Sequence, residues 1–216
     1  MSGLLIVGAG GHGKVIADSA FELGRWERIA FLDDKYPALR RVLEWTVLGN
    51  MKGAERFVNQ FQEASVAIGE NLLRMKIFNR LAEDGFEMPV IIHPRAAVSK
   101  RAVMERGSFV MSQAAVNVSA HVGTGCIVNT GATVGHDSIL GNFVHVAPGS
   151  NIGGKTVIGA GSWIGIRSVI IEGIKVGKGV LIGAGAVIIR DVPDYSLVVG
   201  NPGRIIKILR PNSDFL

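Results

Sequence analysis

The sequence predicts a chain of two parts. Residues 1–91 are expected to form an α/β domain around a small parallel sheet, residues 92–193 a parallel β-helix of six-residue repeats, and residues 194–216 a C-terminal cap. Two observations lead to this prediction. Short apolar stretches alternate with helical patterns before residue 91, and from residue 92 an aliphatic residue or Met recurs at every sixth position. The length of 216 residues suits one large domain or two small ones.

The N-terminal part alternates strands and helices. Its apolar stretches predict strands at Leu4–Val7, Arg28–Leu32 and Ser65–Ile68. Its helical patterns fall at Lys14–Leu23, near Lys52–Phe61 and at Leu72–Glu83. Such an alternation predicts an open parallel sheet with helices packed on it.

The second part repeats with a period of six. Stepping by six from Ile92 to Ile188 gives seventeen positions, and every one is aliphatic or Met. Small or β-branched residues, Cys126 among them, stand two positions earlier, and glycine often follows. This period fits neither a helix nor a long strand, but it fits short strands joined by tight turns. Three such strands close a triangular coil of eighteen residues, and stacked coils rise by about 4.8 Å. Cys126 is therefore expected in the core.

One column of outward positions is unusually apolar. Every eighteenth residue along it is large: Phe109, Ile127, His145, Trp163 and Leu181. A contiguous apolar patch of this size is rarely left exposed on a monomer. We therefore expect the column to pack against other copies of the chain, most simply in a closed cyclic homotrimer.

The C-terminal residues read as a turn and a short amphipathic segment. The turn is Gly200–Arg204, and the segment that follows is Ile205–Leu209. A segment of this kind can cover the open edge that the last coil leaves, because an exposed sheet edge offers unpaired backbone groups.

Composition excludes several classes of protein. With 48% hydrophobic and 19% charged residues, the chain is expected to be soluble and globular, with no membrane span. A single Cys excludes an internal disulfide framework, and no leader pattern is seen, so we expect a cytoplasmic protein. Residues 1–91 hold 11 basic and 12 acidic residues, and the remainder 12 and 6. The basic excess is spread thinly, which favours a small polyanion over nucleic acid.

A glycine-rich loop follows the first predicted strand. It contains Gly8, Gly10, Gly11, His12 and Gly13, and the paired acids Asp33 and Asp34 end the second strand. Glycines there allow a phosphate to approach a helix N-terminus, as in dinucleotide-binding proteins. Only about ninety residues precede the repeats, enough for one Rossmann-like half. A mononucleotide or sugar-nucleotide site is therefore favoured over an NAD dehydrogenase or a purely structural turn. His12 is interpreted as a ligand contact or a surface residue.

Histidines recur well inside the repeats. His121, His136 and His145 raise the hypothesis of a zinc site, but His121 and His145 belong to different faces of the coil, so ligands would have to come from neighbouring chains. His136 is followed by Asp137 and lies outside the two inward positions. An accessible imidazole beside a carboxylate suits a general base, although an exposed turn histidine is the alternative.

Together these motifs resemble a known family. GAGGHGK at residues 8–14, FLDD, IGENLLRMKI, the hexapeptide run and NTGATVGHD at residues 129–137 resemble the left-handed β-helix sugar acyltransferases. The resemblance covers nearly the whole chain. It is closest to the nucleotide-amino-sugar N-acetyltransferases of the bacillosamine type, and the related sialic acid O-acetyltransferases share the pairing of domains. The left hand of the coil is implied by this resemblance alone.

The resemblance implies roles for particular residues. His136 takes the place of the general base, with Asp137 where the family commonly has glutamate, and Asn129 and His145 match further active-site positions. The residues matching the sugar-nucleotide site are Gly8, Gly10, Gly11, His12, Gly13, Asp33, Asp34, Gly69, Asn71 and Arg74. Those expected at the acetyl-CoA site are His145, Trp163, Gly165 and Gly183. No metal is implied.

The implied reaction is acetyl transfer from acetyl-CoA to the C4 amine of a nucleotide-linked 4-amino-4,6-dideoxy sugar, with a UDP-linked bacillosamine precursor favoured. CoA would lie along the groove between the β-helices of two neighbouring chains. Three alternatives stay open: a sialic acid-type O-acetyltransferase, an N-acetyltransferase of GDP-perosamine or a dTDP-amino sugar, and a zinc-dependent hydratase on the same β-helix.

Overall fold

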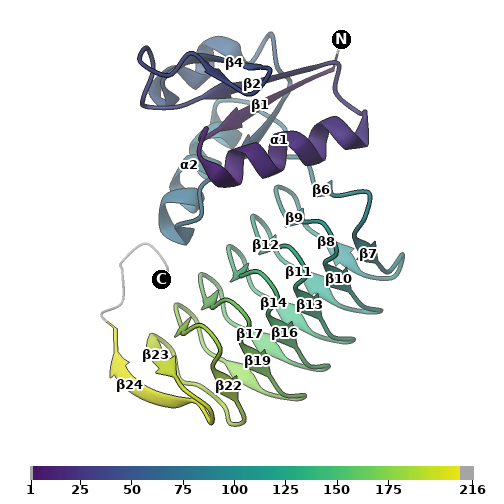
Figure 1. Cartoon of the computed structure of the whole chain (residues 1–216), viewed down its shortest axis with the longest axis vertical. Helices are drawn as coiled ribbons and strands as arrows, with labels where there is room; N and C mark the ends of the chain where they lie inside the picture. Colours follow the sequence, from purple (N-terminus) through teal and green to yellow (C-terminus); the bar gives the residue numbers. More distant parts are fainter. Residues whose placement is uncertain (1, 210–216) are drawn as a thin grey trace. The chain divides into compact units, whose positions relative to one another are not determined.

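The computed structural model describes residues 2–209, and the chain divides into two compact units, Met1–Pro94 and Arg95–Leu216. Each unit has its own architecture (Figure 1). The strands and helices expected from the sequence are present in both, so the predicted fold class is confirmed. Within residues 2–209 no helix is long and apolar enough to cross a bilayer.

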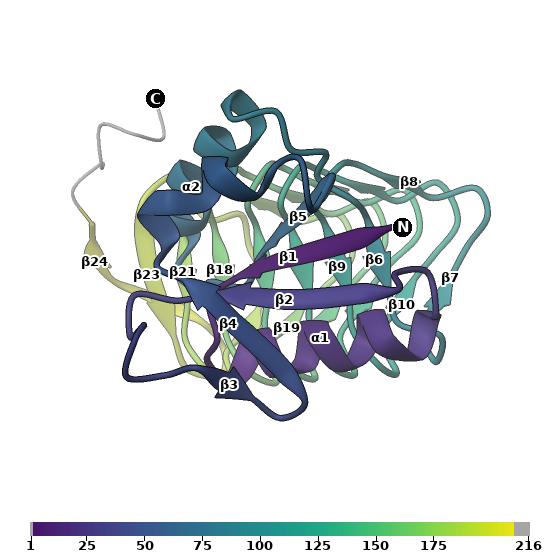
Figure 2. The same ribbon diagram turned by 90° about the horizontal axis from the view of Figure 1, so that it is seen from above.

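The first unit is a five-stranded sheet of order β3-β4-β2-β1-β5. Its strands are β1 (Gly3–Val7), β2 (Arg28–Leu32), β3 (Arg41–Val42), β4 (Trp45–Gly49) and β5 (Glu63–Val66). All pair in parallel except the edge strand β3. Helix α1 (Gly11–Leu23) packs along β1 and β2, and α2 (Asn71–Glu83) along β5 (Figure 2). The short strand β6 (Ile91–Ile92) ends the unit.

Three elements of this unit differ from their predicted bounds by two residues or more. Helix α1 begins at Gly11 rather than Lys14, because the glycine loop itself supplies the first turn. Strand β5 ends at Val66, two residues before the predicted end. The predicted helix near Lys52–Phe61 is a 3₁₀ helix, η1 (Met51–Phe57), interrupted by non-helical backbone angles at Gly53. Tertiary context decides such boundaries more than local propensity does.

The second unit is a three-sided solenoid of two-residue strands (Figure 1). The first side contains β7 (Ala97–Val98), β10 (Ala115–Val116), β13 (Thr133–Val134), β16 (Asn151–Ile152), β19 (Val169–Ile170) and β22 (Val187–Ile188). The second contains β8 (Val103–Met104), β11 (His121–Val122), β14 (Ile139–Leu140), β17 (Val157–Ile158) and β20 (Lys175–Val176). The third contains β9 (Phe109–Val110), β12 (Ile127–Val128), β15 (His145–Val146), β18 (Trp163–Ile164), β21 (Leu181–Ile182), β23 (Ser196–Val199) and β24 (Arg204–Ile208).

The register of these strands confirms the predicted coil. Ala115 pairs with Thr133, His121 with Ile139 and Ile127 with His145, so each residue meets the one eighteen positions later. The second residue of most strands is buried, as the six-residue period requires.

Small polar residues bond one coil to the next inside the solenoid. The hydroxyls of Ser138, Ser150 and Ser162 donate to the carbonyls of residues fifteen positions later, at 2.9, 2.6 and 2.8 Å. The thiol of Cys126 makes the equivalent bond to the Gly141 carbonyl at 3.0 Å and is buried. The prediction that Cys126 is a core residue is confirmed.

The expected exposed apolar column is wrong for three of its five members. Phe109, Ile127 and His145 are 1%, 0% and 5% exposed, whereas Leu181 is 40% exposed. A repeat shows which side chains point outward from a coil, but not what packs on that side. Exposed apolar side chains lie instead on the second side, at Val103, Ile139 and Val157.

The solenoid ends in a paired edge. Strand β23 pairs in parallel with β21, and β24 pairs antiparallel with β23 after the turn near Gly200. Strands β23 and β24 lie within the predicted cap, residues 194–216, of which residues 210–216 lie outside the described residues.

Candidate active site

His136 and Asp137 form a hydrogen-bonded pair at the corner between β13 and β14. His136 Nδ1 lies 2.7 Å from Asp137 Oδ2, and both side chains are about half exposed. Asp137 adopts a left-handed backbone conformation (φ 57°), which short polar side chains tolerate. When Nδ1 carries the proton donated to this carboxylate, Nε2 is left with its lone pair. Asp137, although one methylene shorter than glutamate, can therefore orient the imidazole as a general base requires.

The backbone around His136 is tied to the coils on either side. The His136 carbonyl accepts from the N–H of Lys155 at 2.8 Å, and the N–H of Asp137 donates to the Val118 carbonyl at 3.1 Å. These bonds fix the corner, so that the position of the ring depends mainly on its side-chain rotamer.

Asn129, His145 and Trp163 form a second group, on the third side of the solenoid. Asn129 Nδ2 lies 3.2 Å from His145 Nε2, and the rings of His145 and Trp163 are 4.1 Å apart between centroids. Asn129 follows β12, whereas His136 follows β13, so the two groups occupy different corners of the coil. Within one chain the structure does not bring Asn129 or His145 together with His136.

Gly165 and Gly183 stand in the same column of corners as Asn129. A methyl group on Gly165 would overlap the backbone of the next coil, and one on Gly183 would lie 2.9 Å from a side-chain carbon of Val199. Packing between coils therefore accounts for these glycines. Their predicted contact with acetyl-CoA stays a prediction.

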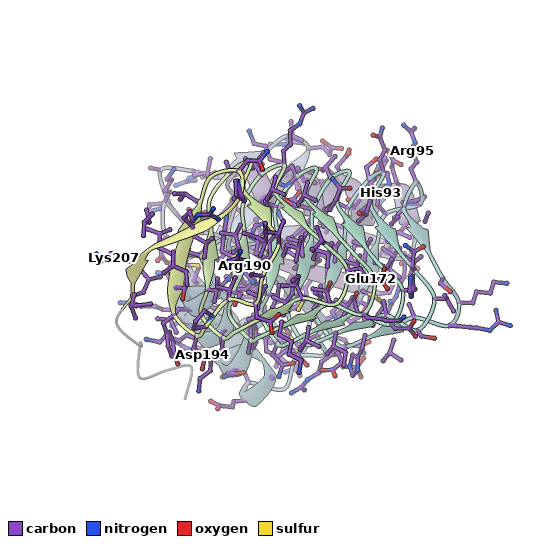
Figure 3. The ribbon with its side chains drawn as sticks, turned by 90° about the horizontal axis from the view of Figure 1, so that it is seen from below. His93, Arg95, Glu172, Arg190, Asp194 and Lys207 are labelled. Carbon is purple, nitrogen blue, oxygen red and sulfur yellow. The ribbon has the colours of Figure 1, made fainter. Side chains whose placement is uncertain are left out.

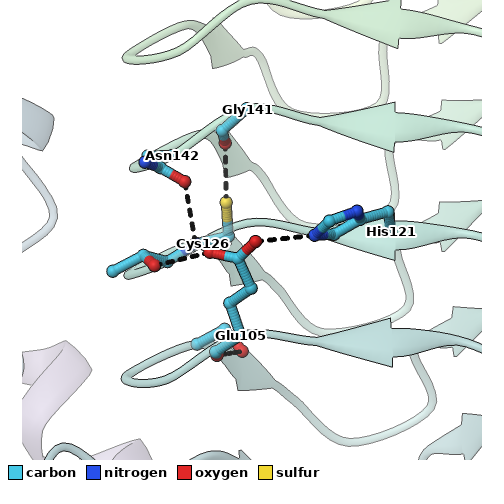
Figure 4. A network of polar contacts seen from close by, with 7 residues as sticks. Glu105, His121, Cys126, Gly141 and Asn142 are labelled. Carbon is cyan, nitrogen blue, oxygen red and sulfur yellow. Dashed lines mark hydrogen bonds and ion pairs between the residues drawn. The ribbon is translucent and has the colours of Figure 1, made fainter.

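His121, the first residue of β11, belongs to a separate polar network with Glu105, which lies at the corner between β8 and β9 (Figure 4). Its Nε2 lies 2.7 Å from Glu105 Oε1, while Glu105 Oε2 accepts from the backbone N–H and the hydroxyl of Thr124 at 3.0 and 2.6 Å. The hydrogen bonds from Thr124, and then from His121, lower the pKa of Glu105. Because these bonds connect successive coils, the network is a structural link. Across residues 2–209 there is no cluster of three His, Cys, Asp or Glu side chains that could hold a metal ion.

The glycine loop of the first unit leaves an open approach to the start of α1. Gly8 has a left-handed φ of 103°, and Gly13 packs so closely on the Gly8 carbonyl that a side chain would not fit. Around Gly10 and Gly11, by contrast, nothing lies within 4 Å of where a Cβ would stand. A pocket of about 390 Å³ opens there, lined in part by Lys14, Lys35 and Arg41.

Those three cations were not singled out from the sequence. Lys14 ends the GAGGHGK motif and Lys35 follows Asp34 directly, so both stood beside recognised signals. Arg41 reaches the pocket from the β3 hairpin, and no local sequence pattern indicates that it lies there. A helix N-terminus combined with Lys and Arg side chains is a suitable environment for a phosphate group.

Asp33 binds the glycine loop itself. Its Oδ2 accepts from the N–H of Ala9 at 2.8 Å, and its Oδ1 accepts from the N–H of Lys35 at 2.9 Å. Asp34 is exposed and accepts from the N–H of Met51 at 3.3 Å. Asp33 is thus a residue that shapes the site, and Asp34 is the more accessible carboxylate.

His12 is partly buried in the second position of α1. Burial, and then the positive charge of Arg74, lower the pKa of His12 from 6.5 to about 4, so the ring is neutral at pH 7. The interpretation of His12 as an ordinary surface residue is therefore wrong, because the loop is packed against the body of the first unit.

Arg74 holds the turn between β5 and α2 from inside. It is 1% exposed and donates to the carbonyls of Ile68 and Gly69 at 3.1 and 2.9 Å and to Asn71 Oδ1 at 2.8 Å. Gly69 has open space where a Cβ would stand. Gly69, Asn71 and Arg74, which were predicted together, are therefore joined by hydrogen bonds through which Arg74 orders the loop.

Comparison with known proteins decides the family. Residues 3–81 match the family model of the PglD N-terminal domain, and residues 155–190 match that of the bacterial transferase hexapeptide (six repeats). The acetyltransferase domain of PglB from Neisseria gonorrhoeae FA1090, solved with acetyl coenzyme A, is 42% identical with a TM-score of 0.91 over 94% of this chain and 98% of that one. The chain belongs to the left-handed β-helix sugar acyltransferases.

Two further sugar acyltransferases extend the comparison. The perosamine N-acetyltransferase of Caulobacter crescentus, solved as a mutant with CoA and GDP-perosamine, is 34% identical with a TM-score of 0.91 over 96% of this chain and 98% of that one. The UDP-N-acetylbacillosamine N-acetyltransferase of Bacillus subtilis (strain 168) is 32% identical over 114 residues, which are 52% of either chain. The present chain thus spans about half the length of that curated relative.

Proposed function

We propose that this chain transfers the acetyl group of acetyl-CoA to the C4 amine of a nucleotide-linked 4-amino-4,6-dideoxy sugar, with a UDP-linked bacillosamine precursor as the favoured acceptor. The hydrogen-bonded pair of His136 and Asp137 carries the proposal, because it presents an oriented imidazole nitrogen in a chain of this family. The acetyl-CoA-containing PglB domain, at 42% identity, supports the choice of donor.

The proposed base is Nε2 of His136. It takes a proton from the sugar amine as the nitrogen attacks the acetyl carbonyl, and the Asp137 carboxylate stabilises the imidazolium that results. Acetyl-CoA supplies the activated acyl group as a thioester. As the new C–N bond forms the C–S bond breaks, and CoA leaves as the thiol after its thiolate takes the proton from the His136 imidazolium. Cys126 takes no part, because its thiol is buried and donates to the Gly141 carbonyl.

The nucleotide of the acceptor is placed at the glycine loop of the first unit. Its phosphates would meet the open backbone at Gly10 and Gly11, with Lys14, Lys35 and Arg41 supplying positive charge around the pocket. Asp33 and Arg74 hold the surrounding loops in place. Asp34 is the carboxylate proposed to accept from the ribose or the base.

We propose a homotrimer, and the separation of the two site groups supports contact between copies. Asn129 and His145 occupy one corner of the coil and His136 the next, so an active site that uses all three residues needs two copies of the chain. We place acetyl-CoA in the groove between such copies, beside His145 and Trp163. The exposed apolar residues Val103, Ile139 and Val157 support contact between copies on the second side of the solenoid.

The C-terminal end of the solenoid supplies candidates for the phosphates of CoA. A pocket of about 210 Å³ is lined in part by Arg190 and Arg204, and Figure 3 labels Arg190 on the last coil. A planar guanidinium can make two parallel hydrogen bonds to a phosphate group. Arg190 and Arg204 are proposed to bind the phosphates of CoA, which fits the small polyanion that the thinly spread basic residues favoured.

A second candidate acceptor is GDP-perosamine. The observation that favours it is the 34% identity, over 96% of this chain, to the C. crescentus enzyme solved with that sugar. The same pair of units would serve either nucleotide, and Asp34 could accept from uracil or guanine.

The test is an acetyl-transfer assay with matched acceptors. UDP- and GDP-linked 4-amino sugars are compared with the corresponding 4-hydroxy sugars, and CoA release and acetylated product are both measured. We expect acetyl-CoA-dependent modification of an amine, fastest with the UDP-linked sugar. Modification of the hydroxyl sugars alone, or no dependence on acetyl-CoA, would contradict the proposal.

A further inference from the structure

Gly154 differs from most other glycines at the solenoid corners. Gly131, Gly149 and Gly173 have left-handed φ angles of 65°, 68° and 77°, which favour glycine. At Gly135 and Gly153 a methyl group would strike the backbone of the next coil. Gly154 has neither reason, because its φ lies outside the left-handed region and the nearest atoms to its missing side chain belong to one imidazole ring.

That ring is His136. A Cβ on Gly154 would stand 2.5 Å from Nε2, 2.7 Å from Cε1 and 2.9 Å from Cδ2 of His136, all far below van der Waals contact. The imidazole therefore lies across the bare Cα of the following coil. Since Nδ1 faces Asp137 on the opposite edge of the ring, the atom closest to the missing methyl group is Nε2.

We propose that Gly154 is a positioning residue for His136: its lack of a side chain sets the place of the imidazole and leaves Nε2 accessible. This inference rests on the proposed function, in which Nε2 takes the proton from the acceptor. The His136 backbone is already fixed by Lys155, so the rotamer of the ring is the degree of freedom that Gly154 controls.

The same geometry separates a local effect from a loss of fold. In Gly154→Ala the methyl group meets a half-exposed side chain that can rotate away, so the solenoid is expected to keep its stability. In Gly153→Ala the added atom would lie 2.5 Å from the backbone nitrogen of Glu172, which cannot move independently, and folding should suffer. We therefore expect Gly154→Ala to leave the stability of the solenoid unchanged and Gly153→Ala to lower it.

Three measurements on Gly154→Ala test the inference. We expect kcat to fall about 100-fold with KM for acetyl-CoA unchanged, since misplacing a catalytic group by about 1 Å has that effect. The ¹⁵N spectrum of the His136 ring should lose the signature of its Nδ1–H bond to Asp137. In a His136→Ala background, Gly154→Ala should cost less than a further twofold. The matched control for the general effect of a Gly-to-Ala change is Gly24→Ala. Gly24 lies in the first unit at the end of α1, where Ala strains the left-handed backbone (φ 62°) but meets no side chain.

Two outcomes would overturn the inference. One is a Gly154→Ala protein with unchanged ring spectra and a kcat within twofold of that of the unsubstituted chain. The other is an equal loss of rate from Gly154→Ala with and without His136. If the unsubstituted protein acetylates no amino sugar, the proposed function fails, but the ring spectra still decide the role of Gly154 separately.

Discussion

The carboxylate of Asp33 accepts a hydrogen bond from the backbone N–H of Ala9 at 2.8 Å, so the end of β2 holds the glycine loop that follows β1. A second bond, from the N–H of Lys35, fixes the other oxygen of the same carboxylate. The loop that would receive the nucleotide is therefore shaped before any ligand arrives.

Asp33→Ala should weaken nucleotide binding by loosening this loop. Losing two hydrogen bonds to a charged acceptor is expected to cost on the order of 2–3 kcal/mol locally, and we expect KM for the nucleotide sugar to rise about tenfold or more. Acetyl-CoA binding should not change. Calorimetric titration with the nucleoside diphosphate checks the effect, and an unchanged affinity would show that the loop is fixed by other contacts.

Lys14→Ala should weaken binding of the diphosphate group in particular. Removal of one phosphate-binding cation typically costs about 1–2 kcal/mol, which is roughly a tenfold loss of affinity. The measurement is nucleotide affinity as a function of salt concentration, with Lys175→Ala on the solenoid as a control for the change in net charge. Equal affinities in the two variants would remove Lys14 from the site.

His12 should make the stability of the protein depend on pH. Its pKa falls from 6.5 to about 4 on folding, so between these values the unfolded chain binds a proton that the folded chain does not. Stability from this residue is complete above pH 6.5 and is lost as the pH falls through 4, by about 3 kcal/mol in full. Urea unfolding at pH 7.5 and 4.5 should show a smaller difference in His12→Asn, and equal differences would contradict the assignment.

Cys126→Ser should leave activity intact. The serine hydroxyl can make the same bond to the coil above that Ser138 and Ser162 make, so the core is preserved. Steady-state rates within about twofold are expected, because the direct transfer proposed here uses no acyl-enzyme. A loss of tenfold or more with the fold intact would point to a thioester on Cys126.

The six-residue period was sufficient to predict the solenoid, because an aliphatic residue or Met at every sixth position, from Ile92 to Ile188, permits few other structures. The proximity of His136 and Asp137 was equally predictable, since residues adjacent in sequence remain adjacent in any fold. Burial of Phe109 and Ile127 was not predictable, because it depends on what packs on that side of the coil.

The first unit shows the same limit in its site residues. The glycine pattern and the acidic pair lie, as expected, in the loops after β1 and β2, and nucleotide binding there stays a prediction. The pattern did not reveal that Asp33 bonds to Ala9, that Arg74 lies within the turn it orders, or that Arg41 borders the pocket. Each of these depends on contacts between residues distant in the sequence.

The most direct measurement is the rate of acetyl transfer by His136→Ala and Asp137→Asn beside the unsubstituted protein, with folding verified by circular dichroism. We expect kcat to fall by at least about 1000-fold in His136→Ala and by about 10- to 100-fold in Asp137→Asn, with little change in nucleotide affinity. A folded His136→Ala protein that still acetylates the amino sugar at near its original rate would show that this imidazole is not the base.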